Sequence, residues 1–388
     1  MAQTFDAIII GSGVVGNSIA FHLSERGLKP LVVERKSVGC GATGRSSGLV
    51  RMHYDLEIDS RLAWESYKYF INWRARVGGE CGFIRTGFLQ IEPPSHNEHL
   101  RGNVQMHQRI GINTSVISAG DVKKLAPYFN TDDFELAAYE PDSGYADPTL
   151  TANSFLNAAK DRGAVLLQDC AVTGIQTANG KVIGVQTAKG EFSAPIIVNA
   201  AGAWAARIAQ MAGVKIPLTV WTHDVAFLRR PPKVGFHPAV IDGSLNMYFR
   251  PEGSALTLAA LEEDSIRGDS PDEENERVMP DFLERLIDRL CQRIPAMEEG
   301  GPHSTHVGRD GLTPDQRAIL GQAGPEGFYL ACGFSGTGFK TSPAVGACMA
   351  ELILDGRATT VDIAPLTPER FARGELLKGE FNYGNIWK

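Results

Sequence analysis

The sequence has no hydrophobic run of the length that crosses a membrane, and it has no excess of basic residues. A membrane-spanning helix needs roughly 18 or more consecutive apolar residues, and the first apolar run, Ala7 to Ile10, leads directly into glycines, so we interpret it as a strand and not as a signal peptide. The formal net charge is −7. Such a charge argues against nucleic acid as the main partner, because the phosphate backbone attracts basic surfaces.

Cysteine and histidine are few and scattered. The six cysteines form no CxxC pair and no zinc-ligand spacing, so we expect free thiols and a cytoplasmic location. His303 and His306 lie close together in a stretch expected to be a loop, but no cysteine or third histidine is near them in the sequence. We therefore predict no metal site.

The residues that are present are typical of a globular enzyme. Apolar residues make up 43% of the 388 residues, which is enough to build a sizeable core. The length predicts two or three domains, or two domains built from interleaved segments.

A β-α-β unit occupies the first part of the chain. The apolar, β-branched stretch Thr4–Ile10 predicts a buried strand, Asn17–Arg26 has the apolar spacing of a helix, and Pro30–Glu34 predicts a second strand. The turn between the first strand and the helix reads Gly11-Ser-Gly-Val-Val-Gly16. Two such strands joined by one helix form a parallel pair with a right-handed crossover.

The spacing of the glycines and the acid after them favours a dinucleotide site. Gly11 permits the tight turn, Gly13 lets the backbone approach a pyrophosphate, and Gly16 lets the helix pack close to the strand. Glu34 can accept hydrogen bonds from the hydroxyls of a ribose that has no 2′-phosphate. The alternative is an ordinary β-α-β turn that binds nothing. The glycine-rich loop Gly39–Gly48, which follows at once, favours FAD over a nicotinamide cofactor.

Farther along the chain the patterns predict separate helices and short strands. The last helix is expected to begin with Ser342 as its N-cap and Pro343 as its first residue. The other expected helices cover 59–77, 98–110, 149–162 and the end of 271–293, and the expected strands cover 87–91, 165–167, 172–177, 182–187, 196–198 and 327–331, with a β-rich region over 216–261.

Seven segments occur in the order found in one family of flavoproteins. They are Asp6–Gly13, Ala42–Arg51, Ser143–Pro148, Val198–Trp204, Tyr248–Pro251, Asp315–Gly321 and Cys332–Lys340. With these segments the chain resembles the D-amino acid oxidase-like (DAO) superfamily of FAD-dependent oxidoreductases. Within that superfamily it is similar to monomeric sarcosine oxidase, to the β subunit of heterotetrameric sarcosine oxidase and to glycine oxidase.

The resemblance implies an α/β fold with two domains. The first is a Rossmann-like FAD-binding domain of the glutathione reductase type, expected from residues 1–85, 145–215 and 310–388. The second is an α+β substrate-binding domain with a mixed or antiparallel sheet, expected from residues 86–144 and 216–309.

The resemblance also implies how FAD is held. Val172 would contact the adenine, although it could be a simple core residue, and the N-terminus of the last helix would face the flavin N1/O2 edge, although that glycine turn could be structural. The residues expected to bind FAD are Gly11, Gly13, Val14, Val15, Gly16, Glu34, Arg35, Thr43, Gly44, Arg45, Ser46, Ser47, Gly48, Leu49, Val172, Ala200, Ala201, Gly202, Trp204, Gly333, Gly336, Thr337, Gly338, Phe339 and Lys340.

Two cations are the main candidates for substrate binding. By resemblance, Arg51 and Lys340 would grip a substrate carboxylate and so place the α-carbon beside flavin N5, unless they are solvated surface charges. Tyr248 would close the site or hydrogen-bond the substrate, unless it is a core residue. Weaker candidates, expected to be structural or at the rim, are Arg45, His53, Tyr54, His223 and Arg250.

The implied reaction is oxidation of a small carboxylate-bearing amine, such as sarcosine, glycine or another N-methyl or D-amino acid. The α-carbon would deliver hydride to FAD, and the imine would then hydrolyse. The segment Ser254–Leu258 lacks the lysine that monomeric sarcosine oxidase uses toward oxygen, so rapid reaction with dioxygen is not implied. The acceptor could be dioxygen or another electron acceptor, such as a quinone or an electron-transfer protein. The segment Gly308–Asp315 lacks that relative's flavin-tethering cysteine, so FAD is expected to be non-covalent.

Three alternatives stay open at this point. The chain could be an FAD-dependent 2-hydroxy-acid dehydrogenase, the flavoprotein subunit of a hetero-oligomeric amine dehydrogenase, or a nicotinamide-dependent enzyme. The sequence allows a homo- or a hetero-oligomer.

Overall fold

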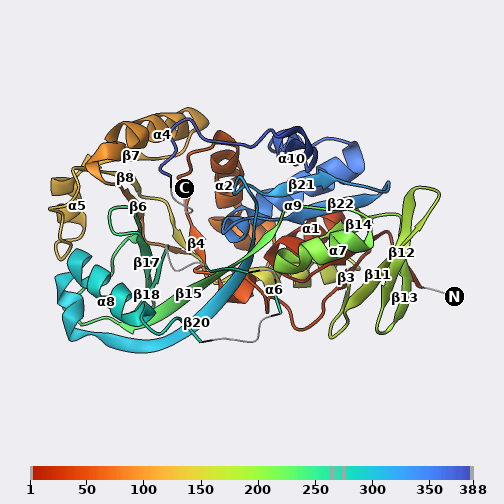
Figure 1. Cartoon of the computed structure of the whole chain (residues 1–388), viewed down its shortest axis with the longest axis horizontal. Helices are drawn as coiled ribbons and strands as arrows, with labels where there is room; N and C mark the ends of the chain where they lie inside the picture. The colour runs from red at the N-terminus through yellow and green to blue at the C-terminus, as the bar shows by residue number, and fades with distance from the viewer. Residues whose placement is uncertain (1–2, 263–265, 269, 273–276, 385–388) are drawn as a thin grey trace.

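Two large sheets lie along the long axis of the molecule. The computed structural model describes residues 3–262, 266–268, 270–272 and 277–384. In Figure 1 the strands of a nine-stranded sheet fill most of the left half, and a six-stranded sheet with its helices lies to the right of centre. The long strands β15 (Thr219–Arg229) and β20 (Gly301–Leu312) run from the first region toward the second.

The six-stranded sheet contains the predicted β-α-β unit. Its strand order is β10-β3-β2-β14-β22-β21, parallel except for the antiparallel last pair. The strands are mostly apolar because both faces of the sheet are covered. The bounds are β10 Val165–Leu167, β3 Pro30–Val33, β2 Ala7–Ile10, β14 Ile197–Asn199, β22 Phe328–Cys332 and β21 Ile319–Gln322.

Alternate residues of β2 belong to different core clusters. Ala7 and Ile9 pack in the cluster that contains α1 (Val14–Glu25), α6 (Pro148–Lys160) and α9 (Gly338–Asp355). Ile8 and Ile10 pack instead with α7 (Ala205–Met211) and with residues of a separate four-stranded sheet. This two-sided burial follows from the period of two in a strand and fixes the start of α1 at the end of β2.

The nine-stranded sheet is mixed, as the resemblance implies. Its order is β19-β15-β18-β17-β16-β6-β8-β7, with β20 paired to β15, and only the β16–β6 pair is parallel. The remaining bounds are β19 Ile266–Gly268, β18 Leu256–Leu261, β17 Met247–Glu252, β16 Ala239–Asp242, β6 Phe88–Ile91, β8 Leu136–Glu140 and β7 Ser115–Ser118.

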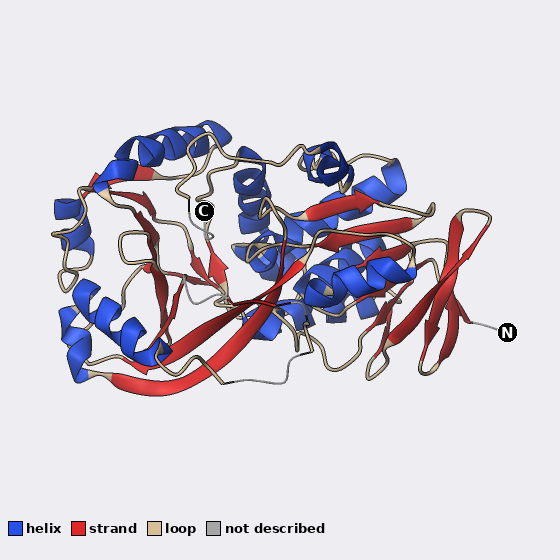
Figure 2. Cartoon of the chain, viewed as in Figure 1, coloured by secondary structure: helices blue, strands red, loops and turns tan. Residues whose placement is uncertain are grey.

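Alternation along β17 determines which way Tyr248 points. Met247 and Phe249 pack in the cluster that includes α8 (Phe282–Arg293), whereas Tyr248 belongs to the cluster on the other face. Helices α4 (Asn97–Ile110), α5 (Ala119–Leu125) and α8 lie on the outer left side of the molecule (Figure 2, with labels in Figure 1). The face that carries Tyr248 is therefore left for the cavity described below.

Two smaller sheets and the remaining helices complete the chain. The expected helix over 59–77 is two helices, α2 (Glu57–Phe70) and α3 (Trp73–Arg76). The other elements are β1 Gln3–Thr4, β13 Gly190–Ser193, β12 Lys181–Thr187 and β11 Val172–Ala178 in one sheet, β4 Leu49–Val50, β9 Gly144–Tyr145 and β5 Ile84–Arg85 in the other, and α10 Glu369–Arg373.

The prediction for the start of the last helix is wrong. Helix α9 begins at Gly338 with Thr337 as its N-cap, and Pro343 lies inside it. Proline has no N–H, so it leaves the carbonyl four residues earlier without its helical partner. Here the Ser342 hydroxyl donates to that carbonyl, Phe339 O, at 2.8 Å. The serine therefore compensates for the proline within the helix and does not cap it.

Other expectations have mixed outcomes. The α/β fold class is confirmed, and all six cysteines are free. The expected loop at His303 and His306 is wrong, because both lie on β20, where long pairing with β15 orders the chain. No helix in the described ranges has the length and apolar character of a membrane span. The domain boundaries stay a prediction.

Candidate functional site

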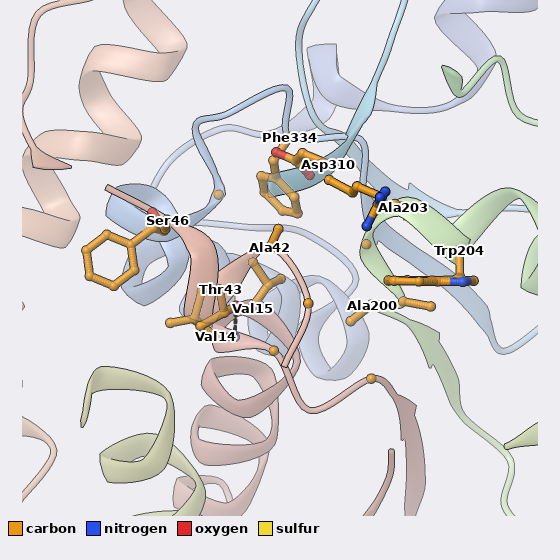
Figure 3. A pocket seen from close by; sticks show the side chains of 18 of the residues that line it. Val14, Val15, Ala42, Thr43, Ser46, Ala200, Ala203, Trp204, Asp310 and Phe334 are labelled. Carbon is orange, nitrogen blue, oxygen red and sulfur yellow. Dashed lines mark hydrogen bonds between the residues drawn. The ribbon is translucent and has the colours of Figure 1, made fainter. Parts of the chain in front are cut away.

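A cavity of about 900 Å³ lies where the two large sheets meet. Its lining comes from the N-terminal ends of α1 and α9, from the loop after β3, from the segment after β14, and from strands of the nine-stranded sheet. Figure 3 shows side chains from these segments, including Val14, Thr43, Ala200, Trp204 and Phe334, arranged around one space. This volume is within the range of sites that bury a whole ligand.

The glycine turn brings three backbone segments together at one end of the cavity. Gly11 has a φ of 108°, and a Cβ atom there would lie 2.5 Å from Ala200 O. A Cβ at Gly16 would lie 2.0 Å from Gly11 O. Both positions need glycine, because the helix and the next strand approach too closely for a side chain. The N-terminus of α1 therefore faces the cavity, next to the backbone of the glycine turn, which carries no side chain at Gly11 and Gly13.

The N-terminus of α1 has no side-chain cap, so its first backbone N–H groups can bind a ligand. Gly13 is its N-cap and provides no side chain to cap the helix. The Val14 N–H donates to Thr43 Oγ1 at 3.0 Å, drawn as a dashed line in Figure 3, which ties the glycine-rich loop to the helix. The partial positive charge of a helix N-terminus attracts an anion.

Glu34 closes the same end of the cavity. Its Oε2 accepts from the Ser12 N–H at 2.8 Å, and its Oε1 accepts from the Lys36 N–H at 2.8 Å. Cys40 Sγ also lies 3.9 Å from Oε1. A carboxylate can accept about four hydrogen bonds, so Oε2 keeps a lone pair for a ligand hydroxyl.

A second acid, Asp272, lies across the opening at this end. It accepts from Trp204 Nε1 at 2.7 Å and from Arg35 Nη1 at 2.7 Å, and it also pairs with Arg207. The Arg35 guanidinium lies 4.4 Å from the centre of the Trp204 ring. These contacts join the segment that contains Asp272 to the β-α-β unit.

The N-terminus of α9 faces the cavity from the other side. Before it, Gly336 has a φ of 86°, and its N–H donates to Asp310 Oδ2 at 2.8 Å. Asp310 Oδ1 accepts from the Gly311 N–H at 2.7 Å. Burial raises the pKa of Asp310. The acid therefore fixes the glycine turn from which the helix starts.

Arg51 and Lys340 are 289 positions apart in the sequence, yet both are buried and line the cavity. Burial, followed by the nearby Arg51 charge, lowers the pKa of Lys340 well below its usual value. The Lys340 ammonium donates to Gly336 O at 3.1 Å. The Arg51 guanidinium donates to the carbonyl oxygen of His53 and lies 4.2 Å from the centre of the Tyr54 ring. Two buried cations that disfavour each other make an anion-binding arrangement.

Tyr248 also lines the cavity and is 5% exposed. Burial raises the pKa of its hydroxyl, and a hydrogen bond with the Ser47 side chain acts against that rise. The tyrosine is therefore a neutral hydrogen-bonding group in an apolar wall.

An ion-pair network that sequence reasoning missed supports the same wall. Arg317 lines the cavity and pairs with Asp55 and, at 3.1 Å, with Asp59. Burial raises the pKa of Asp59 to about 6, in opposition to the Arg317 charge. The only signal for Arg317 was its place in the segment Asp315–Gly321.

Most of the predicted site residues border the cavity. Gly16, Gly44, Gly48 and Gly333 are not among its lining residues, and neither are the weaker candidates His53 and Arg250. The predicted residues that line it are Gly11, Gly13, Val14, Val15, Glu34, Arg35, Thr43, Arg45, Ser46, Ser47, Leu49, Arg51, Tyr54, Val172, Ala200, Ala201, Gly202, Trp204, His223, Tyr248, Gly336, Thr337, Gly338, Phe339 and Lys340.

The missed lining residues include several that the sequence gave little reason to select. Asp310 is part of no motif selected from the sequence, and only the fold brings it close to Lys340. Trp221 and Phe334 are apolar and resemble core residues in a sequence pattern. Asp272 lies in a charged stretch with no motif.

Comparisons with known proteins agree with this geometry. The family model DAO, described as FAD dependent oxidoreductase, matches residues 6–352. The mitochondrial sarcosine dehydrogenase of Mus musculus is 29% identical over 92% of this chain, which spans only 40% of that protein's length. Sarcosine oxidase subunit beta of Rhizobium meliloti (strain 1021) is 25% identical over 98% of this chain and 92% of that subunit.

One solved structure covers nearly the same length as this chain. The crystal structure of L-proline dehydrogenase from P. horikoshii has a TM-score of 0.91 and 29% sequence identity, over 97% of this chain and 100% of that chain. The TM-score shows that this solved structure shares the fold of the chain.

Proposed function

Because the chain belongs to the DAO family of FAD-dependent oxidoreductases, we propose that it oxidises a small amine that carries a carboxylate, of the sarcosine, glycine, proline or N-methyl amino acid type. FAD, when bound, supplies the acceptor for the hydride that leaves the α-carbon. The resulting imine is hydrolysed to a carbonyl product and ammonia or a smaller amine. The names of the relatives, which act on sarcosine or L-proline, support this substrate class.

The lining residues fit the parts of FAD. The N-terminus of α1, from Gly13 onward, would hold the pyrophosphate, and Glu34 would accept from the adenosine ribose. The close approach of Gly11 to Ala200 leaves room for a dinucleotide where a Cβ would otherwise lie. The N-terminus of α9 would place N–H groups near the electron-rich edge of the ring system.

The observation that carries the proposal is that two buried basic side chains, Arg51 and Lys340, line the same cavity. Beyond burial, the Arg51 charge helps to lower the pKa of Lys340, whereas Asp310 and Asp59 act in the opposite direction. A substrate carboxylate between the two cations would restore the charge on Lys340, because an anion raises the pKa of a buried ammonium. Holding the carboxylate at two points orients the α-carbon, which is a large part of the rate enhancement.

Tyr248 would act on the other side of the substrate. Its hydroxyl stays protonated because burial raises its pKa, so it can donate to the substrate or cover it. The apolar residues around it keep water from the reacting carbon until the imine is formed.

Three observations bear on the electron acceptor, the assembly and the compartment. Strand β18 carries no lysine, which argues for an electron acceptor other than dioxygen. The likeness to a sarcosine oxidase β subunit supports action within a hetero-oligomer. Six free cysteines support a reducing compartment such as the cytoplasm.

Anaerobic bleaching of the flavin tests the proposal. The purified holoprotein is mixed with sarcosine, glycine, dimethylglycine, proline enantiomers and D-amino acids, with amines that lack the carboxylate, and with matched 2-hydroxy acids. We expect bleaching by at least one carboxylate-bearing amine and none by its counterpart without the carboxylate. Bleaching by hydroxy acids alone would assign a 2-hydroxy-acid dehydrogenase instead.

Variants of the two cations connect the result to the site. Arg51→Met and Lys340→Met should each lower kcat/KM by roughly ten- to hundredfold, because a hydrogen bond to a charged group contributes about 1.5–3 kcal/mol. Lys124→Met is the control, since this lysine of α5 is 80% exposed. Equal activity of all three variants would contradict the carboxylate clamp.

A further inference from the structure

Three buried side chains converge outside the cavity lining. His53 lies in the loop after β4, His107 lies on α4, and Glu140 is the last residue of β8, and each is 0% exposed. One candidate ligand atom of each lies within 4.8 Å of the other two. The two imidazole rings have centroids 4.6 Å apart. Among the described residues this is the single group of three or more histidines, cysteines or acids with that spacing.

Both imidazoles are held by one ring nitrogen. His107 Nε2 lies 2.8 Å from Tyr54 O, and His53 Nε2 lies 2.8 Å from the hydroxyl of Tyr383. The Tyr54 N–H also lies 3.3 Å from His107 Nε2, but the carbonyl contact is the shorter one. A carbonyl oxygen can only accept, so in the tautomer that satisfies it His107 donates from Nε2 and its Nδ1 carries a lone pair. His53 Nδ1 and His107 Nδ1 are both buried and have no hydrogen-bond partner in the part of the chain that is described.

In Glu140, too, one side-chain oxygen accepts hydrogen bonds and the other has no partner among the described residues. Its Oε2 accepts from the Met52 N–H at 3.0 Å and from Ser143 Oγ at 2.6 Å. Its Oε1 is buried and without a hydrogen bond to any described residue. One buried polar atom left unsatisfied costs about 1–3 kcal/mol. Each of the three residues thus has one buried polar atom without a partner among the described residues, and one shared electron-poor partner would satisfy all three.

The geometry points to a buried divalent metal site of the zinc type, with His53 Nδ1, His107 Nδ1 and Glu140 Oε1 as its protein ligands. Two imidazole nitrogens and one carboxylate oxygen form a donor set that binds Zn²⁺. Mg²⁺ and Ca²⁺ prefer oxygen ligands to imidazole. The carbonyl behind His107 is the outer partner that metal-bound histidines use. In a tetrahedral site with bonds of about 2.0–2.2 Å the ligand atoms lie roughly 3.4 Å apart, so atoms that are up to 4.8 Å apart would move closer together when the metal binds.

The nearby Arg51 charge narrows the class of ion. The positive charge of Arg51 disfavours a proton on either imidazole, and it would repel a metal cation in the same way. A cation held only by electrostatic attraction is therefore disfavoured at this place. The ion must therefore form direct ligand bonds, which transition metals do most strongly with neutral imidazole.

The metal would join three parts of the chain that are far apart in sequence. It would tie α4 and β8 to the loop that carries Arg51, whose guanidinium already donates to the His53 carbonyl. The role of the metal would be to position the backbone of Arg51. This last consequence rests on the proposed function, whereas the metal site itself does not.

Metal analysis of the full-length holoprotein tests the site. The chain is produced in zinc-supplemented and in metal-depleted medium, and metal and FAD are quantified per chain. We expect one equivalent of tightly held metal in the wild type after dialysis, and a chain from depleted medium with a lower Tm that Zn²⁺ restores. Co²⁺ in place of Zn²⁺ should give ligand-field bands on the long-wavelength side of the flavin absorption.

Variants separate the three ligands from general damage. Glu140→Gln and His107→Gln should lose the metal, and Zn²⁺ should no longer raise their Tm. His99→Gln is the matched control, because His99 lies on the same helix outside the cluster and should leave the metal content unchanged. A wild type that holds no stoichiometric metal after zinc supplementation, as expected for a bridging water, would overturn the inference. So would full metal content in both ligand variants. Flavin bleaching is measured on the same samples, so a failure of the proposed activity stays distinguishable.

Discussion

Lys340 is a lysine whose charge depends on what lies beside it. Burial and the Arg51 charge lower its pKa, while Asp310 and Asp59 act in the opposite direction. A bound carboxylate would raise that pKa, so binding takes up a proton at pH values above the pKa of the free site. We predict that the affinity for a small carboxylate such as acetate falls as the pH rises, by up to about tenfold per pH unit.

The measurement is a titration of the flavin absorbance with acetate at a series of pH values. Lys340→Arg is the informative variant, because a guanidinium keeps its proton throughout and should make the affinity independent of pH. Identical pH dependence in the wild type and in Lys340→Arg would show that another group controls binding.

At the scale of elements, helices α1 and α9 both begin at the cavity and pack closely against each other farther along their length. Gly346 of α9 lies at the crossing with α1, where a Cβ atom would be 2.2 Å from Ser18 Oγ and 2.8 Å from the Ser18 carbonyl carbon. Ser18 Oγ donates to Ser342 O at 2.7 Å, and His22 Nε2 lies 3.1 Å from Pro343 O. Side chains of α1 thus hold the first turns of α9 in position.

We predict that Gly346→Ala destabilises the protein and weakens FAD binding. Alanine in a helix normally gains up to about 1 kcal/mol over glycine, but overpacking of a tight contact costs about 1–3 kcal/mol, so the clash should decide the sign. Denaturant unfolding and the Kd of FAD measure the two effects. Gly120→Ala in α5 is the control, because its Cβ would meet only Ser118 Oγ at 3.6 Å. A stable Gly346→Ala chain with wild-type FAD affinity would contradict this role of the crossing.

The same helices show how far the sequence could predict the fold. The glycines of the first turn, the following helix and Glu34 were predictable because each is a local requirement of a β-α-β unit. The start of α9 was not, because Ser342 and Pro343 form a favourable N-terminal pattern. What overrides that pattern is the Ser342 hydroxyl, which satisfies the carbonyl of Phe339.

The predictability of the site has a similar limit. Residues in family segments, such as Arg51 and Lys340, could be selected because the resemblance carried them. The His53, His107 and Glu140 cluster could not, because its members come from a loop, a helix and a strand, with no ligand spacing along the chain. Arg317 lies in a family segment but was missed because its partners Asp55 and Asp59 are distant in sequence, and Asp310 was missed because its contact with Gly336 is made only in the fold.

At the scale of the whole molecule, the cavity places its thiols away from the two cations. Two cysteines line it, Cys40 and Cys170, and both lie beside Glu34. Cys40 Sγ is 3.9 Å from Glu34 Oε1, and the Cys170 N–H donates to Glu34 O at 2.9 Å. In the orientation proposed above this is the adenosine end, so neither thiol is placed to form a bond with the ring system.

We therefore predict that acid precipitation releases all the flavin, leaving a yellow supernatant and a colourless pellet. A reversibly held cofactor that binds only the folded chain adds about 2.7 kcal/mol to its stability at a free concentration of 100 times Kd. The Tm of the protein should consequently rise with added FAD and fall after its removal. Flavin fluorescence that stays with the denatured chain would contradict the prediction. His223, which also lines the cavity, would then be the residue to replace first, because its loss should free the colour if it forms the link.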